Sequence, residues 1–124
     1  MESTNELRLG ANEMKFAEII WENAPLSSMR LAALARERLG WAKTTSYTVL
    51  RRLCEKGVFK NDSSVVTAIL TPEEYHALRG EQFVDADYGG SLPAFVAAFS
   101  RRRELSDGEI AELKALVAEF EGRK

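Results

Sequence analysis

The clearest chemical pattern in the sequence lies on one expected helix, where polar, aromatic and basic side chains recur at helical spacing. At about 100° per residue, Thr44, Tyr47, Thr48, Arg51 and Glu55 gather on one side of that helix. Arginine can read guanine through two hydrogen bonds, and threonine can contact a phosphate or a thymine methyl group. Together with neighbouring groups this pattern predicts a DNA-binding set consisting of Lys43, Thr44, Thr45, Tyr47, Thr48, Arg51, Arg52 and Lys60.

Two kinds of DNA contact are expected within this set. Arg51 lies with the threonines and is expected to reach bases, whereas Arg52 and Lys43 are expected to contact phosphates, which set register without reading sequence. The alternative is an exposed helix face with no ligand. Threonine and tyrosine are poor helix formers for a purely solvated surface, and this favours DNA contact.

The charge distribution supports a polyanionic partner. Residues 27–60 carry eight Lys/Arg against two Glu, a net +6, whereas the whole chain of 124 residues has a net charge of −2 and residues 61–124 carry −5. A basic segment in an acidic protein predicts a surface that faces double-stranded DNA. A solvated helix face with uneven charge is the alternative.

Other chemistries lack the residues they need. The single cysteine, Cys54, cannot form an internal disulfide, and with one histidine it cannot complete a soft-ligand zinc or copper site. Cys54 is instead expected to be a packed thiol, and His76 is given no role. No nucleophile, base and orienting group recur at a plausible spacing, so no catalytic residue, metal or cofactor is predicted and an enzyme ranks last.

The elements that must position the basic face are three helices and a hairpin. The apolar spacing predicts helices from Ala11 to Asn23, from Ser27 or Ser28 to Leu39, and from about Lys43 to Lys56. The third helix is expected to bury Ser46, Val49, Leu50 and Leu53. Two β-prone runs, 58–60 and 65–70, then flank the polar connection 61–64. This order is typical of a winged helix-turn-helix, in which the third helix enters the DNA major groove.

The last third of the chain is helical in a different way. Capping patterns at Thr71 and Ser106 open helices, the first ending near Arg79 because Gly80 interrupts it, and Ser91 caps a helix between them. Two short amphipathic helices cannot cover their own apolar stripes, so a homodimer is expected. The dimerisation residues are predicted to be Leu92, Phe95, Val96, Phe99, Ile110, Leu113, Leu116, Val117 and Phe120.

The fold class is therefore mainly α: an N-terminal winged helix-turn-helix of three helices and a short β-hairpin wing, followed by C-terminal dimerisation helices. The expected boundaries are a flexible tail over 1–10, a DNA-binding domain over 11–71 and a dimerisation region over 72–124. No apolar run approaches the length of a membrane helix. The first residues have neither the basic nor the apolar region typical of a signal peptide, so we expect none. We expect a cytoplasmic protein with no membrane insertion.

The sequence resembles the penicillinase repressor family (BlaI/MecI/CopY) of winged-helix transcription regulators. Three stretches carry the resemblance: 19–27 around Trp21, 40–57 around the third helix, and 89–92 with 104–110 in the last third. It implies a dimeric repressor of a palindromic operator, of a β-lactam-resistance-type or a related operon, with Thr45, Thr48 and Arg52 at the family's helix positions. This chain departs from the family in having Ser46 where valine is usual, and a shorter, less basic wing.

The resemblance also bears on release from DNA. In the β-lactam-responsive branch a membrane-bound sensor metalloprotease triggers cutting of the repressor at an Asn-Phe bond. The equivalent bond here joins Ala98 to Phe99, so the phenylalanine is kept and the asparagine is lost. The alternative is that Phe99 only forms part of the apolar stripe. The copper-responsive branch carries a C-terminal cysteine cluster, whereas this chain has no cysteine after Cys54, so sensing of Cu(I) by thiolates is not expected. The alternative function is a winged-helix protein-interaction or antirepressor module with weak or no DNA binding. Such a module could bury the face of the third helix, which a DNA reader must keep open.

Overall fold

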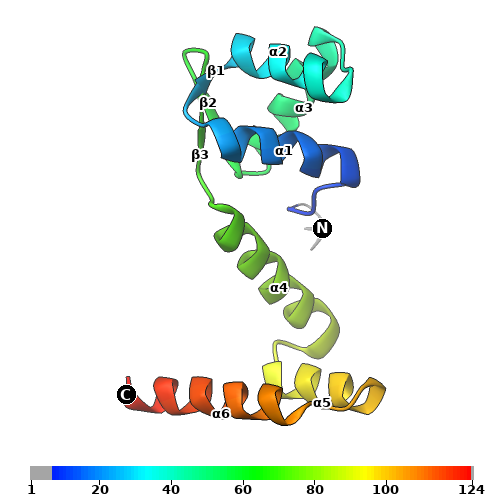
Figure 1. Cartoon of the computed structure of the whole chain (residues 1–124), viewed down its shortest axis with the longest axis vertical. Coiled ribbons are helices and arrows are strands. Elements are labelled where there is room, and N and C mark those ends of the chain that lie inside the picture. Colours follow the sequence, from blue (N-terminus) through cyan, green and yellow to red (C-terminus); the bar gives the residue numbers. More distant parts are fainter. Residues whose placement is uncertain (1–6, 124) are drawn as a thin grey trace.

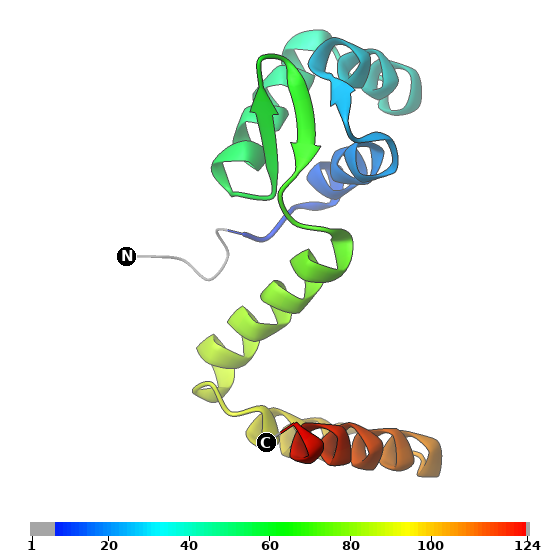
Figure 2. The same ribbon diagram turned by 90° about the vertical axis from the view of Figure 1, so that its left-hand side faces the viewer.

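The computed structural model describes residues 7–123, which form six helices and three strands. The helices are α1 (Ala11–Asn23), α2 (Ser28–Leu39), α3 (Lys43–Glu55), α4 (Pro72–Tyr88), α5 (Leu92–Arg102) and α6 (Asp107–Gly122), and the strands are β1 (Leu26–Ser27), β2 (Phe59–Asp62) and β3 (Val65–Ala68). A head of α1–α3 and the sheet lies at one end, and α4 runs from it to the antiparallel pair α5–α6 (Figures 1 and 2). The predicted fold class is confirmed.

The core of the head forms where the three helices turn their apolar faces toward the sheet. α1 contributes Phe16 and Ile20, and α3 buries the four residues that its wheel predicts, Ser46, Val49, Leu50 and Leu53. α2 begins at an N-cap in which the Ser27 side chain accepts a hydrogen bond from the backbone of Arg30. Burying one face of α3 directs its opposite face to the outside of the head.

The sheet is antiparallel, with strand order β1-β3-β2. The two residues of β1 pair with Val65 and Val66, and were not predicted as a strand because two residues show no periodicity. The connection between β2 and β3 is shorter than expected, because 61 and 62 belong to β2. Ser63 and Ser64 make the turn, with φ of 52° and 66°, the left-handed backbone of a tight hairpin.

The expectation of a flexible tail over 1–10 is wrong for residues 7–10. Leu7 and Leu9 are each only 7% exposed and belong to the core of the head. The backbone N–H of Leu9 donates to the hydroxyl of Tyr75 at 2.9 Å. Apolar burial and a long-range hydrogen bond order this segment, although it has no secondary structure of its own. Residues 1–6 of the expected tail lie outside the described residues.

α4 is longer than predicted, because Gly80 does not interrupt it. The helix opens with the capping box of Thr71 and Glu74 and continues to Tyr88, where Gly89 takes a left-handed conformation with φ 57°. A glycine inside a helix costs about 1 kcal/mol relative to alanine, which does not outweigh a well-capped helix of 17 residues. None of the helices within residues 7–123 is long and apolar enough to cross a membrane.

Ser46 supplies a test of packing in α3. Its hydroxyl is buried and has no hydrogen-bond partner among the described residues. Ser46→Ala should raise the free energy of unfolding by about 1 kcal/mol, because it removes an unsatisfied buried hydroxyl and improves helix propensity. Urea denaturation measures this. Thr48→Ala on the exposed face of α3 controls for helix propensity, and a less stable Ser46→Ala protein would contradict the prediction.

Candidate nucleic-acid interface

The outward face of α3 brings together most of the predicted DNA-binding residues. Six of them are exposed and Tyr47 is half-buried, the exposed ones on α3 being Lys43, Thr44, Thr45, Thr48, Arg51 and Arg52. A shallow hollow on this face is lined by three threonines and the side chain of Arg52. Hydroxyl, methyl and guanidinium groups therefore lie side by side on a helix that is open to a ligand.

The basic groups of this face are free of internal ion pairs within residues 7–123. Lys43 lies with its ammonium 5.8 Å from the centre of the Tyr47 ring, a cation–π distance along the helix surface. Arg51 and Arg52 make no salt bridge in the described part of the chain. Three positive charges are thus available to a polyanion without first breaking a contact to a carboxylate.

Lys60 is placed apart from this group, on the wing. Its ammonium is 3.8 Å from the carboxylate of Asp62, and both side chains are more than half exposed. An exposed pair of this kind contributes about 0 to 1 kcal/mol, so it does not hold Lys60 firmly. Lys60 is the only Lys or Arg in residues 58–70, and Asp62 cancels its charge. The wing therefore adds no net positive charge to the surface.

Aromatic packing fixes the orientation of α3 within the head. Trp41, just before α3, stacks on Phe16 of α1 with ring centroids 5.1 Å apart. Trp21 packs on Phe59 at 5.2 Å, and its indole N–H donates to the carbonyl of Leu70 at 2.9 Å. Both tryptophans therefore anchor the packing of the head.

A half-buried ion pair at the end of α3 was missed from the sequence. The Lys56 ammonium lies 3.2 Å from a carboxylate oxygen of Glu13 and donates to the carbonyl of Arg8 at 2.7 Å. Burial alone would raise the pKa of Glu13, but the backbone N–H of Gly10 and the charge of Lys56 hold that pKa below its ordinary value. Sequence reasoning counted Lys56 only as part of the basic segment, because nothing local joins it to a carboxylate 43 residues away.

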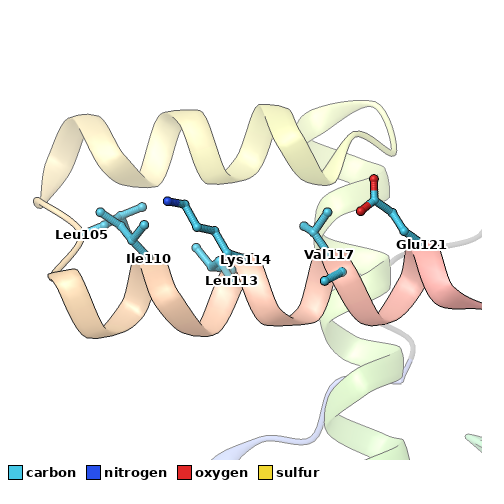
Figure 3. A pocket seen from close by; sticks show the side chains of 7 residues that line it. Leu105, Ile110, Leu113, Lys114, Val117 and Glu121 are labelled. Atoms are coloured by element: carbon cyan, nitrogen blue, oxygen red, sulfur yellow. The ribbon is translucent and has the colours of Figure 1, made fainter.

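The predicted dimerisation stripes lie on the outside of α5 and α6, neither of which contains a buried residue. Phe95, Val96 and Phe99 are half-buried, and the more exposed members are Leu92, Ile110, Leu113, Leu116, Val117 and Phe120. Figure 3 shows an apolar hollow on α6 lined by Leu105 and stripe residues, with Lys114 and Glu121 beside it. The structure thus brings the stripes together as one uncovered apolar surface.

Two aromatic residues extend this surface beyond the prediction. Phe83 and Tyr88 of α4 pack edge to face with Phe95, at 5.7 Å and 5.4 Å between ring centroids. They were missed because α4 was expected to end near Arg79. A prediction that continued the helix through Gly80 would have included both residues.

The bond between Ala98 and Phe99 lies inside α5, with both residues half-buried. The guanidinium of Arg103 lies 5.2 Å from the centre of the Phe99 ring, and the backbone N–H of Arg103 donates to the Phe99 carbonyl at 3.1 Å. A protease that binds extended substrate must unwind this turn before it can cut.

The single cysteine and the single histidine of the chain, Cys54 and His76, lie in ordinary packing environments. Burial raises the pKa of the half-buried Cys54 thiol, which disfavours the reactive thiolate. The exposed His76 lies against the ring of Tyr75 at 5.2 Å. Within residues 7–123, no three His, Cys, Asp or Glu side chains are grouped in a way that would hold a metal ion.

Three packed helices, a wing and an open basic face on the third helix define a winged-helix DNA-binding protein. Comparison with known families gives the particular assignment: the family described as penicillinase repressor matches residues 9–119. The chain belongs to the penicillinase repressor family. It is therefore a DNA-binding transcriptional repressor, in a family of repressors rather than enzymes.

Two curated relatives can be aligned with this chain over almost their whole length. The penicillinase repressor of Bacillus licheniformis is 25% identical over 116 residues, covering 90% of this chain and 91% of the relative. The methicillin resistance regulatory protein MecI of Staphylococcus aureus (strain Mu50 / ATCC 700699) is 23% identical over 113 residues, covering 88% of this chain and 92% of the relative. The head and the helices that follow it both fall within the matched region.

Proposed function

We propose that this repressor acts in the cytoplasm as a homodimer on a palindromic operator. The observation that carries the proposal is the uncovered apolar surface of α5 and α6, joined through α4 to a head whose α3 face is open. A second copy related by a two-fold axis covers that surface and presents two α3 helices to successive turns of the DNA. Residues 11–71 then serve DNA binding and 72–124 dimerisation.

Each side chain on the open face has a role in this proposal. Arg51 reads a base edge, Arg52 and Lys43 hold phosphates, and Lys60 reaches the backbone from the wing. Thr44, Thr45, Tyr47 and Thr48 fill the space between those contacts. The alternative, an interaction module that buries this face, would need a protein partner whose own carboxylates pair with these three cations.

Replacing the two adjacent arginines should separate sequence reading from backbone binding. Arg51→Ala should weaken binding by about 1 to 3 kcal/mol and relax the base preference, because it removes a contact to a base edge. Arg52→Ala should weaken binding to all duplexes alike and reduce the salt dependence, because it removes a phosphate contact. Fluorescence anisotropy with a palindrome selected from random DNA, and with mismatched versions at two salt concentrations, measures both effects.

The control for this pair is Lys15→Ala on α1, which removes the same charge from an exposed residue outside the proposed contact set. Equal affinities of the wild type and both arginine variants for every duplex would contradict the assignment. Loss of base preference in Arg52→Ala alone would exchange the two roles.

For the regulated operon we propose a β-lactam-resistance type, which the names of the two relatives support. A membrane-bound sensor metalloprotease is then the releasing partner, with the bond between Ala98 and Phe99 as its cutting position. Cutting there separates most of the α5 stripe from α6, so the dimer should weaken and paired operator binding should lose its avidity. Mass spectrometry of the protein from induced cells should show fragments ending at Ala98. Intact chain despite derepression would reject proteolytic release.

A further inference from the structure

The N-terminal strap, defined as residues Leu7–Gly10, touches both the end of α3 and the start of α4. Leu7 and Leu9 are buried in the core of the head. The carbonyl of Arg8 accepts from the Lys56 ammonium, and the N–H of Gly10 donates to Glu13, which also pairs with Lys56. At this end the strap is fixed to the residue that follows α3.

At its other contact the strap holds the first turn of α4. Tyr75 is 2% exposed, and its hydroxyl accepts the hydrogen bond from Leu9. The ring of Tyr75 also lies 5.9 Å from the indole ring of Trp21. The indole N–H of Trp21 donates to the carbonyl of Leu70, just before α4. Tyr75 is therefore held between the strap and Trp21, and the direction of α4 is fixed at its first turn.

A small change of direction there has a large effect at the far end of α4. The helix has 17 residues, which at 1.5 Å each span about 25 Å. From Tyr75 to Tyr88 the helix spans about 20 Å, so a tilt of about 10° at Tyr75 would move the far end of α4 by about 3 Å, roughly the rise of one base pair of DNA. Figures 1 and 2 show α4 as the connection between the head and the α5–α6 pair.

We propose that the strap, through Tyr75 and Lys56, sets the distance between the two α3 helices of the dimer and hence the operator half-site spacing that the repressor accepts. This rests on the proposed function, a homodimer on a palindromic operator. Tyr75 and Lys56 act as positioning residues: neither contacts a base, and both limit the angles that α4 can take relative to α3.

The test measures spacing preference and not affinity alone. The half-site is first obtained by selection from random DNA with the wild type, and two inverted copies are then separated by spacers of every length up to one helical turn. For each protein the readout is the ratio of affinities for the best spacer and for a spacer one base pair longer. A loss of folded protein lowers both affinities equally and leaves this ratio unchanged.

Tyr75→Phe keeps the ring and removes the hydroxyl that Leu9 uses, and Lys56→Met keeps the stem and removes the ammonium. Either change should lower the spacing ratio by about fivefold, the equivalent of one hydrogen bond. Lys56→Arg keeps a cationic donor and should retain the wild-type ratio. Lys15→Met on α1 is the matched control for the loss of an ammonium, since Lys15 is exposed and forms no ion pair among the described residues.

The outcomes distinguish this inference from the function on which it rests. A wild type that selects no paired half-sites overturns the proposed function, and the inference with it. A wild type with a spacing preference that both Tyr75→Phe and Lys56→Met retain unchanged overturns the inference alone. A reduced ratio in both variants, with Lys15→Met and Lys56→Arg unchanged, supports it.

Discussion

Leu113→Asp should convert the proposed dimer into a monomer. Leu113 lines the apolar hollow of Figure 3 and a second hollow that residues of both α5 and α6 line. It is 38% exposed in the single chain, so a partner copy would complete its burial. In a symmetric dimer the change buries two unpaired carboxylates, at a cost on the order of several kcal/mol each. Sedimentation velocity measures the loss of the dimer. Operator affinity should fall by about 10² to 10⁴-fold, because the second head no longer binds from the same molecule.

The matched control is Ala115→Asp, which places the same charge on α6 about 200° around the helix from Leu113. It should leave the dimer intact. A Leu113→Asp protein that sediments as the wild type does would show that α6 is not the dimer contact. Monomeric protein from both variants would instead indicate that any added charge on α6 is disruptive.

Phe59→Ala should destabilise the head by about 3 to 5 kcal/mol without dissociating the dimer. Phe59 is fully buried and packs on Trp21 at the start of β2, so its removal leaves a cavity between the sheet and α1. Both tryptophans of the chain, Trp21 and Trp41, lie in the head. Tryptophan fluorescence during urea denaturation therefore reports unfolding of the head, and sedimentation reports the dimer separately.

Ile69→Ala serves as the control for Phe59→Ala, because Ile69 is apolar but more than half exposed. It should change the free energy of unfolding by about 0.5 kcal/mol or less. A loss of the dimer together with the head in Phe59→Ala would mean that the two parts fold as one cooperative unit. An unchanged denaturation midpoint would mean that the core around Phe59 repacks.

Local signals in the sequence were sufficient to place most of the head. The periodicity of α3 identified its buried face because a helix repeats its environment every three to four residues. The caps at Ser27, Thr71 and Ser106 were readable because each capping hydrogen bond spans only three residues. The exposed residues of α3, which we propose contact DNA, followed from the same wheel, as the side that the core does not use.

The features that the sequence did not reveal depend on contacts between distant residues. The strap is ordered by a hydrogen bond from Leu9 to a residue 66 positions later, and Lys56 pairs with a carboxylate 43 positions earlier. α4 also continues past Gly80, although a glycine inside a helical pattern predicts an interruption. The free-energy cost of that glycine is small for a well-capped helix. No periodicity or motif encodes these contacts, so they appear only once the chain is folded.

The opposite net charges at the two ends of the molecule should also orient the protein as it approaches DNA. Residues 7–71, which form the head, carry ten Lys/Arg against six Asp/Glu, a net +4, whereas residues 72–124, which include α4 to α6, carry seven against eleven, a net −4. Figure 2 shows α4 running from the head to the α5–α6 pair. A molecule with such a dipole experiences a torque in the field of the phosphates, which turns the basic end forward and the acidic end away. Most encounters should therefore begin head first, and dissolved salt should slow their rate by screening that torque.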